Sequence, residues 1–213
     1  SESKKKIPAV VEFHDIAGLV KGESTGEGLG NQFLAHIREC SAIVEVGRCF
    51  HDDVVSHVES RVDPVTDIDI IQLELELKDA DAKEQENLLA IKPKIFLLNG
   101  KPEDVSDVLK IKLASMGAAY VIADLANAEG VPELVAKAYD VLGLMSFYTT
   151  GEDESRAWTI CKGEKAPQAA GEIHTDFEQK FIRAEAVNAQ LLLEFGSWQK
   201  AKQAGKIRLE GKD

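Results

Sequence analysis

The 213-residue sequence has few cysteines and no long apolar run. Cys40, Cys49 and Cys161 are odd in number and scattered, which argues against a disulfide framework and indicates reduced thiols in the cytoplasm. No apolar stretch approaches the roughly 18 residues of a membrane-spanning helix, and no signal peptide is recognisable. We therefore expect a cytoplasmic protein without a membrane partner.

Positive charge is also scarce. The sequence contains 25 Lys and Arg against 37 Asp and Glu, for a net charge of −12. Such a chain repels phosphate on average, so it is not a general polyanion binder and DNA is not an expected partner, although a local basic patch is compatible with this charge. Hydrophobic residues make up 44% of the chain, enough for one sizeable domain or two smaller ones.

Short β-rich runs alternate with helical patterns over the first two thirds of the sequence. We expect strands at residues 7–14, 42–49, 94–98 and 119–123, and helices at 31–40, 68–89, 104–116 and 131–142. This alternation predicts an α/β fold, with a mostly parallel sheet covered by helices on both faces.

The pattern changes after Leu144. We expect paired strands at 147–150 and 156–161, a loop at 162–171, a short helix at 174–181 and a strand at 182–187. This order predicts a compact α+β module with a domain boundary near Met145. His174 precedes the short helix, where a capping role is expected.

Residues 10–33, VVEFHDIAGLVKGESTGEGLGNQF, place a carboxylate at the end of an apolar run and glycines directly after it. Ligands of an open parallel sheet bind beyond the carboxyl ends of its strands. There, Asp15 could hold Mg²⁺ through water, and the N–H of Gly18 could contact a terminal phosphate. The pattern is typical of a γ-phosphate sensor, followed by a segment that orders when triphosphate binds.

Other interpretations of this stretch remain open. A strand-end aspartate such as Asp15 often caps the next element. Gly26, Gly28 and Gly30 do not have the spacing of a dinucleotide-binding motif. The five histidines show no repeated helical spacing and no pairing with the cysteines, so a structural zinc site is not expected.

Longer strings carry a family resemblance. "DIAGLVKG", "GEGLGNQFLAHIRE", "RCF" and "DPVTDIDII" together resemble the YchF-type, Obg-like P-loop NTPases of the TRAFAC class, and "RAWTI", "KAPQAAGEIHTDFE" and "FIRAE" resemble the family's TGS domain. The resemblance runs from about Val10 to Asp213. It implies a partial G domain over residues 1–144, with a shortened helical insertion at about 65–90, and a β-grasp TGS domain over 145–213.

The resemblance also implies Mg²⁺-dependent hydrolysis of ATP or GTP and association with large or assembled ribosomal particles. Asp15 would be the Mg²⁺-linked aspartate and Gly18 the γ-phosphate contact, together forming the catalytic site. Asn99, Gly100 and Glu103 would border the base. An ordinary turn is the alternative for Asn99 and Gly100.

GTPases normally carry Asn-Lys-x-Asp at this position, and the YchF family carries Asn-x-x-Glu. In this sequence Pro102 occupies the place of the acid, and Glu103 comes one residue later. Loss of the guanine-selective acid is consistent with tolerance of ATP.

Two departures from the family concern the ends of the chain. The sequence contains no Gly-x-x-x-x-Gly-Lys-[Ser/Thr] motif, whose backbone N–H groups and lysine cradle phosphates. The first strand, the threonine-bearing first switch and the last TGS strand are also expected to be missing. We interpret the chain as an incomplete stretch of an NTPase switch. The alternative is a non-hydrolysing module that binds the ribosome or RNA through the TGS domain.

Basic residues of the second module could form a surface for RNA. Arg156 lies two residues before Trp158 in the sequence, and Arg183 and residues 200–208 add further positive charge. Cations with an aromatic side chain nearby are typical of RNA contacts. A solvated surface is the alternative for short charged runs of this kind.

Overall fold

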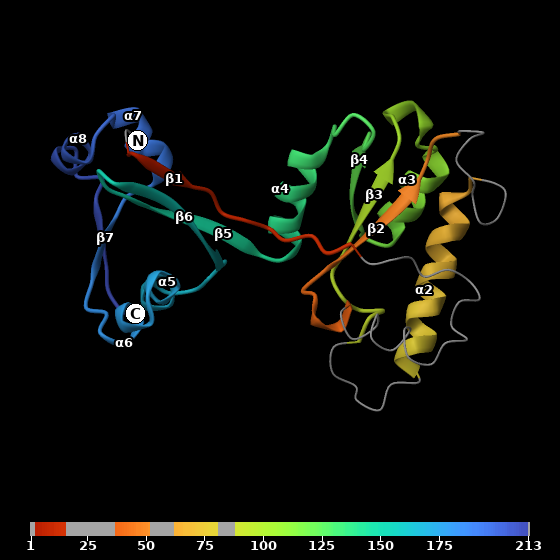
Figure 1. Ribbon diagram of the computed structural model, residues 1–213, viewed down its shortest axis with the longest axis horizontal. Helices are drawn as coiled ribbons and strands as arrows, with labels where there is room; N and C mark the ends of the chain where they lie inside the picture. Colours follow the sequence, from red (N-terminus) through yellow and green to blue (C-terminus); the bar gives the residue numbers. More distant parts are fainter. Residues whose placement is uncertain (1–2, 16–36, 52–61, 81–87, 213) are drawn as a thin grey trace. The chain divides into compact units, whose positions relative to one another are not determined.

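The computed structural model describes residues 3–15, 37–51, 62–80 and 88–212 (Figure 1). Contacts divide the chain into two units, Glu12–Leu142 and a second unit made of Ser1–Val11 with Gly143–Asp213. The sequence-based division after residue 144 assigned residues 1–11 to the first domain, whereas their contacts group them with the second unit.

A parallel sheet forms the centre of the unit Glu12–Leu142. Its strands are β2 (Ile43–Arg48), β3 (Lys94–Asn99) and β4 (Ala119–Ala123), in the order β2-β3-β4. The middle strand, β3, has four consecutive buried residues, as expected of a strand covered on both faces. Three of the predicted strands are therefore confirmed.

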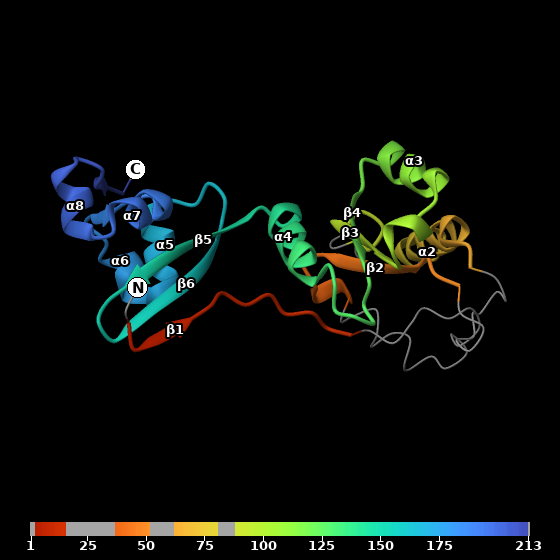
Figure 2. The same ribbon diagram turned by 90° about the horizontal axis from the view of Figure 1, so that it is seen from above.

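Three helices pack on this sheet: α2 (Pro64–Ala80), α3 (Asp107–Ser115) and α4 (Val131–Val141). Figures 1 and 2 show α2 and α3 on one side of the strands and α4 on the other. The main core lies under α2 and α3, where Phe96 and Leu98 of β3 meet Ile68, Leu109 and Leu113. Burying each such side chain contributes about 1.5–3 kcal/mol. The predicted two-sided α/β arrangement is confirmed.

The helix boundaries differ from the predictions for local reasons. Helix α2 begins at Pro64 because the Asp63 carboxylate accepts hydrogen bonds from both the backbone N–H and the hydroxyl of Thr66. Helix α3 begins only after Ser106, whose hydroxyl accepts the N–H of Leu109 at 3.2 Å. Most of the predicted helix 31–40, and residues 81–87 of the predicted helix 68–89, lie outside the described residues, whereas Leu88 and Leu89 are described and are not helical.

The second unit contains a three-stranded sheet of order β1-β6-β5. Strands β5 (Leu144–Thr150) and β6 (Glu154–Cys161) pair with each other, as predicted, in antiparallel direction, and β1 (Lys5–Ile7) pairs in parallel with β6. A separate antiparallel pair is formed by β7 (Ala184–Ala186) and β8 (Arg208–Glu210).

Four helices complete the second unit: α5 (Ala166–Ile173), α6 (Thr175–Gln179), α7 (Ala189–Phe195) and α8 (Trp198–Gln203). The expected loop at 162–171 is wrong, because α5 begins at Ala166, with its proline in the first turn, where no N–H is needed. His174 caps α6, since its Nδ1 accepts the N–H of Asp176 at 3.1 Å.

The predicted strand at 7–14 is also wrong. Among the described residues of this segment, only Lys5–Ile7 forms a ladder, Pro8 has no N–H to donate, and Val10 and Phe13 are 70% and 48% exposed. Asp15 therefore does not end a strand. Among the residues that the structure describes, no helix could cross a membrane.

Candidate functional site

The carboxyl ends of the three parallel strands meet at one edge of the sheet. Directly after β2, the N–H of Cys49 donates to the carbonyl of Asn99 at 2.8 Å. Directly after β3, the N–H of Gly100 donates to the carbonyl of Ala123 at 2.9 Å. The residues that follow β2, β3 and β4 are thus held side by side, at the edge where ligands of open parallel sheets bind.

Asn99 connects two loops at this edge. It is half-buried, and its Oδ1 accepts the N–H of Leu125 at 3.2 Å. Leu125 belongs to the loop that follows β4, where the carboxylate of Asp124 accepts the N–H of Ala126 at 3.1 Å and the side-chain amide of Asn127 at 2.8 Å. One side chain predicted from the sequence is therefore joined to a loop that the sequence analysis did not single out.

Gly100 lies where the backbone is crowded. A Cβ at this position would lie 3.2 Å from Cys49 Cβ and 3.3 Å from Asp104 Oδ2. Burial, followed by the nearby Asp104 carboxylate, raises the pKa of the Cys49 thiol to about 11. Cys49 is thus a neutral residue that packs against the loop that begins at Gly100.

The loop closes on itself through Asp104. Its Oδ2 accepts the N–H of Lys101 at 2.8 Å, which folds Pro102–Asp104 into a single 3-10 turn, η2. The Asp104 carboxylate is therefore used within the turn. Glu103 is exposed and Pro102 carries no carboxylate, so no acid stands where guanine-selective loops place one.

The phosphate side of the predicted site is only partly described. Asp15 is exposed and lies in a segment without regular secondary structure, and Gly18 lies outside the described residues. Across the described ranges, no group of three or more His, Cys, Asp and Glu side chains could hold a metal ion. A single carboxylate nevertheless suits Mg²⁺, which keeps several waters and takes further oxygens from phosphates.

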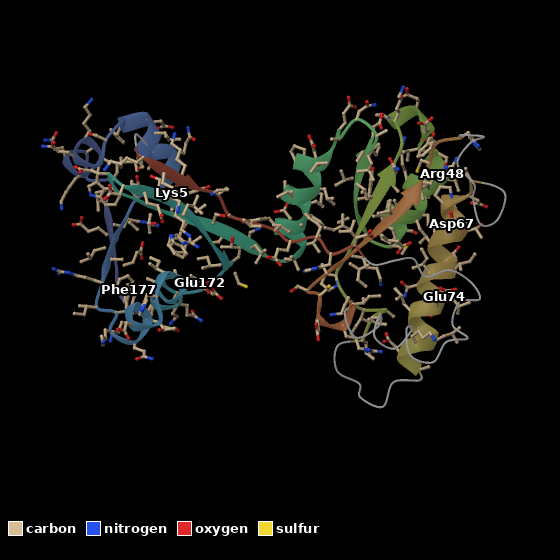
Figure 3. All side chains as sticks on the ribbon, in the orientation of Figure 1. Lys5, Arg48, Asp67, Glu74, Glu172 and Phe177 are labelled. Atoms are coloured by element: carbon tan, nitrogen blue, oxygen red, sulfur yellow. The ribbon has the colours of Figure 1, made fainter. Side chains whose placement is uncertain are left out.

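Arg48, next to this edge, interacts with a residue close to it in the sequence. At the end of β2, the Nε of Arg48 donates to the carbonyl of Phe50 at 3.0 Å, and its guanidinium lies 4.7 Å from the centre of the Phe50 ring. Figure 3 shows Arg48 at this end of the sheet.

A buried acid lies farther inside the same unit. Glu45, in the middle of β2, is 8% exposed, and its Oε1 has no hydrogen-bond partner among the described residues. Burial raises the pKa of Glu45 to about 7, opposed by Lys94 and Lys112 and assisted by Asp67. Burial likewise lowers the pKa of Lys94, whose Nζ donates to Gln72 Oε1 at 3.1 Å.

The basic residues of the second unit mostly contact their own neighbours. The Arg156 guanidinium lies 4.0 Å from the Trp158 ring centre, and Phe147 stacks on the same indole at 6.4 Å. Lys202 pairs with Glu185 at 2.9 Å. The charge is nevertheless unevenly distributed, with 12 Lys and Arg against 25 Asp and Glu in residues 12–142, and 13 against 12 in the rest of the chain.

Comparisons with known proteins agree with this fold. A family model described as "YchF-GTPase_C: Protein of unknown function (DUF933)" matches residues 144–213. The ribosome-binding ATPase YchF of Bacillus subtilis is 37% identical over 291 residues, covering 99% of this chain and 80% of that protein. Human Obg-like ATPase 1 is 34% identical, with 98% and 74% covered.

A solved structure gives the same result. The YchF GTPase of Schizosaccharomyces pombe superposes with a TM-score of 0.80 and 31% identity, covering 100% of this chain and 79% of that one. The aligned stretch with the Bacillus protein is longer than the 213 residues of this chain, so that relative carries internal residues that this chain does not have. The chain belongs to the YchF family of Obg-like ATPases.

Proposed function

We propose that this protein is an Obg-like nucleoside triphosphatase that hydrolyses ATP or GTP and associates with ribosomes in the cytoplasm. The observation that carries the proposal is the 37% identity to a ribosome-binding ATPase over 99% of the chain. The shape of the loops at the carboxyl edge of the sheet supports it independently, because that edge is where nucleotides bind in this fold class.

The base would bind beside Asn99 and Gly100. The Oδ1 of Asn99 is held by Leu125 at 3.2 Å, which leaves its Nδ2 as a donor for a base nitrogen or oxygen. With Pro102 where an acid would select guanine, the loop offers nothing that rejects adenine. Glu103 is exposed on the same turn and would border the base edge.

The phosphates would bind on the side of Asp15 and Gly18. Asp15 would hold Mg²⁺ through its water shell, and Mg²⁺, when bound, neutralises charge on the phosphate oxygens. The backbone N–H of Gly18 would contact the γ-phosphate. Water would then attack the γ-phosphorus as the bond to the β–γ bridging oxygen breaks.

One observation favours a second function. The sequence contains no Gly-x-x-x-x-Gly-Lys-[Ser/Thr] motif, so these residues alone lack the usual phosphate cradle. A non-hydrolysing module would contact ribosomal RNA or protein through the second unit. That unit carries almost no net charge, unlike the strongly acidic first unit, and therefore would not repel RNA as a whole.

Two measurements on the same preparation separate the two functions. Equilibrium binding of ATP and GTP with Mg²⁺, together with phosphate release, tests the first. Sedimentation with ribosomes tests association. Binding that is weakened by Asp15→Asn, with both nucleotides accepted, supports the triphosphatase. Sedimentation with ribosomes in the absence of nucleotide binding supports the non-hydrolysing module. If the protein neither binds nucleotide nor sediments with ribosomes, both proposed functions are contradicted.

A further inference from the structure

The carboxylate of Asp79 joins three hydrogen-bond donors from two distant parts of the chain. Asp79 lies in the last turn of α2, and its side chain is 10% exposed. Its Oδ1 accepts the N–H of Leu89 at 2.9 Å, and its Oδ2 accepts that of Ala90 at 2.8 Å. The Nη2 of Arg38 donates to Oδ1 at 3.3 Å. One buried acid thus ties the segment before β3 and the segment before β2 to α2.

Lys92 also binds the segment that contains Arg38, through backbone carbonyl groups. Its Nζ donates to the carbonyl of Arg38 at 2.8 Å and to that of Cys40 at 2.6 Å. Carbonyl oxygens at the end of a helical turn lack partners within the helix, and an ammonium group is well suited to satisfy them. The segment that contains Arg38 and Cys40 is therefore held by its side chain and by its backbone.

An apolar cluster lies beneath these polar contacts. Ile37, Leu75 and Leu89 are 5%, 2% and 0% exposed and pack together. These residues belong to the same three segments: the turn before β2, helix α2 and the stretch before β3. Buried charged hydrogen bonds are worth more than exposed ones and are screened less by salt. The three segments therefore have the contacts of a single cooperative unit.

A pocket of about 540 Å³ lies at this junction, lined by residues that include Arg38, Glu39 and Lys92. Both of its cations already bind groups of the chain itself, Arg38 to Asp79 and Lys92 to two carbonyls. The observations therefore favour an internal connection over a ligand site.

We propose that Arg38, Asp79 and Lys92 form a latch that makes residues 37–40 and the end of helix α2 move together. Support for the latch comes from the set of hydrogen bonds made by these three side chains. Its meaning for regulation rests on the proposed function: residues 37–40 follow the glycine-rich stretch that begins with Gly18, so a change at the γ-phosphate would reach α2 through Asp79.

Amide hydrogen exchange at Leu89 and Ala90 tests the latch without any ligand. Both N–H groups donate to Asp79, so they report on whether its carboxylate stays in place. Lys92→Met and Arg38→Met should each accelerate exchange at both amides by about tenfold, the factor expected for loss of one charged hydrogen bond. Arg38→Lys, which keeps the positive charge, should leave both amides better protected than Arg38→Met does.

Lys110→Met is the matched control, because the Lys110 side chain pairs with Asp107 at 3.5 Å and, among the described residues, makes no contact with the latch. It should leave both amides unchanged. Thermal unfolding of each variant shows that it is folded before exchange is measured. If Lys92→Met leaves Leu89 and Ala90 as protected as in the parent protein, the contacts are independent of one another and the latch is disproved.

Amide hydrogen exchange in the presence of ATP and Mg²⁺ tests whether a change at the γ-phosphate reaches helix α2 through Asp79. In the parent protein, nucleotide should change exchange at residues 37–40 and at Leu89 and Ala90 together. In Lys92→Met the change should be confined to 37–40. A response limited to 37–40 in the parent protein contradicts the transmission. If equilibrium dialysis detects no nucleotide binding, the proposed function fails, while the ligand-free comparison still decides the latch.

Discussion

The Oδ1 of Asn99 lies 3.2 Å from the backbone nitrogen of Leu125 and accepts its hydrogen bond. The contact spans two strands of the sheet, because Asn99 ends β3 and Leu125 follows β4. It fixes the orientation of the Asn99 amide, and with it the direction in which Nδ2 can donate. The geometry of the proposed base site therefore depends on a loop that contains none of the residues expected to touch the base.

Replacing Asn99 should separate its two roles. Asn99→Ala removes both the acceptor for Leu125 and the donor for the base, and should lower the free energy of unfolding by about 1 kcal/mol and weaken ATP binding by about tenfold. Asn99→Asp keeps the acceptor but not the donor, so it should retain stability and still lose affinity. Urea unfolding and ATP titration measure the two effects. Equal ATP affinity in all three proteins would place the base elsewhere.

Glu45 should make stability fall as pH rises. Its pKa is about 7 in the folded protein against an ordinary 4.5. The unfolded chain therefore loses this proton first, and the free energy of unfolding should decline between about pH 4.5 and 7, by roughly 3 kcal/mol at most. Glu45→Gln should flatten this decline in urea titrations at pH 4.5, 6 and 8. Glu76→Gln, an exposed change on α2, should preserve it, and a decline that survives Glu45→Gln would have another source.

The cysteines should differ in reactivity toward iodoacetamide. Cys161 is exposed, whereas Cys49 is 6% exposed and has a pKa of about 11. At pH 8 only about one Cys49 thiol in a thousand is ionised, and the thiolate is the reacting species. Peptide mass spectrometry should find Cys161 modified first in the native protein, and both modified in urea. Rapid native labelling of Cys49 would show that the loop over it opens readily.

Two glycines with similar backbone angles should respond differently to alanine. Gly130 has φ +83°, and a Cβ there would lie 2.7 Å from Ala123 Cβ and 2.8 Å from the carbonyl of Ile122. Gly117 has φ +61° and no atom within 4 Å of the same position. Gly117→Ala should cost about 1 kcal/mol of stability and Gly130→Ala at least about 3 kcal/mol, because the clash adds to the backbone strain. Equal losses in thermal unfolding would show that β4 shifts to make room.

Local sequence patterns were sufficient for the central sheet. Strands β2, β3 and β4 follow from apolar runs that are long enough to be buried. The run at residues 7–14 is also rich in apolar residues, but after Ile7 it has no ladder partner in the part of the chain that the structure describes. Only tertiary pairing distinguishes the two cases, because intrinsic strand preference depends on the neighbours that a strand finds.

Helix α5 occupies part of the stretch expected as a loop, and it contains a proline and a glycine, two residue types that often interrupt helices. The proline sits in the first turn, where it is tolerated. Gly171 is explained by packing, since a Cβ there would lie 2.8 Å from Glu178 Oε2 of α6. Neither reason is visible before the two helices are placed together.

The candidate site shows the same division. Asn99 and Gly100 were predicted from the family resemblance, and the structure places them at the end of the buried strand β3 and directly after it. The roles of Leu125 and Asp104 depend on the distance between loops and on the direction of a side chain. For the loop after β4, the one feature visible in the sequence was the position of Asp124, immediately after the strand.

The pairing of β1 with β6 has a consequence for synthesis. Lys5 lies beside Glu154 and Ile7 beside Arg156, so β1 is synthesised before the whole unit Glu12–Leu142 and its partner β6 only after it. The unit Glu12–Leu142 has all its described strands in between and can close its sheet earlier. The nascent chain would thus complete this intervening unit first, and the edge of β6 would remain unpaired, open to misassociation, until β1 pairs with it.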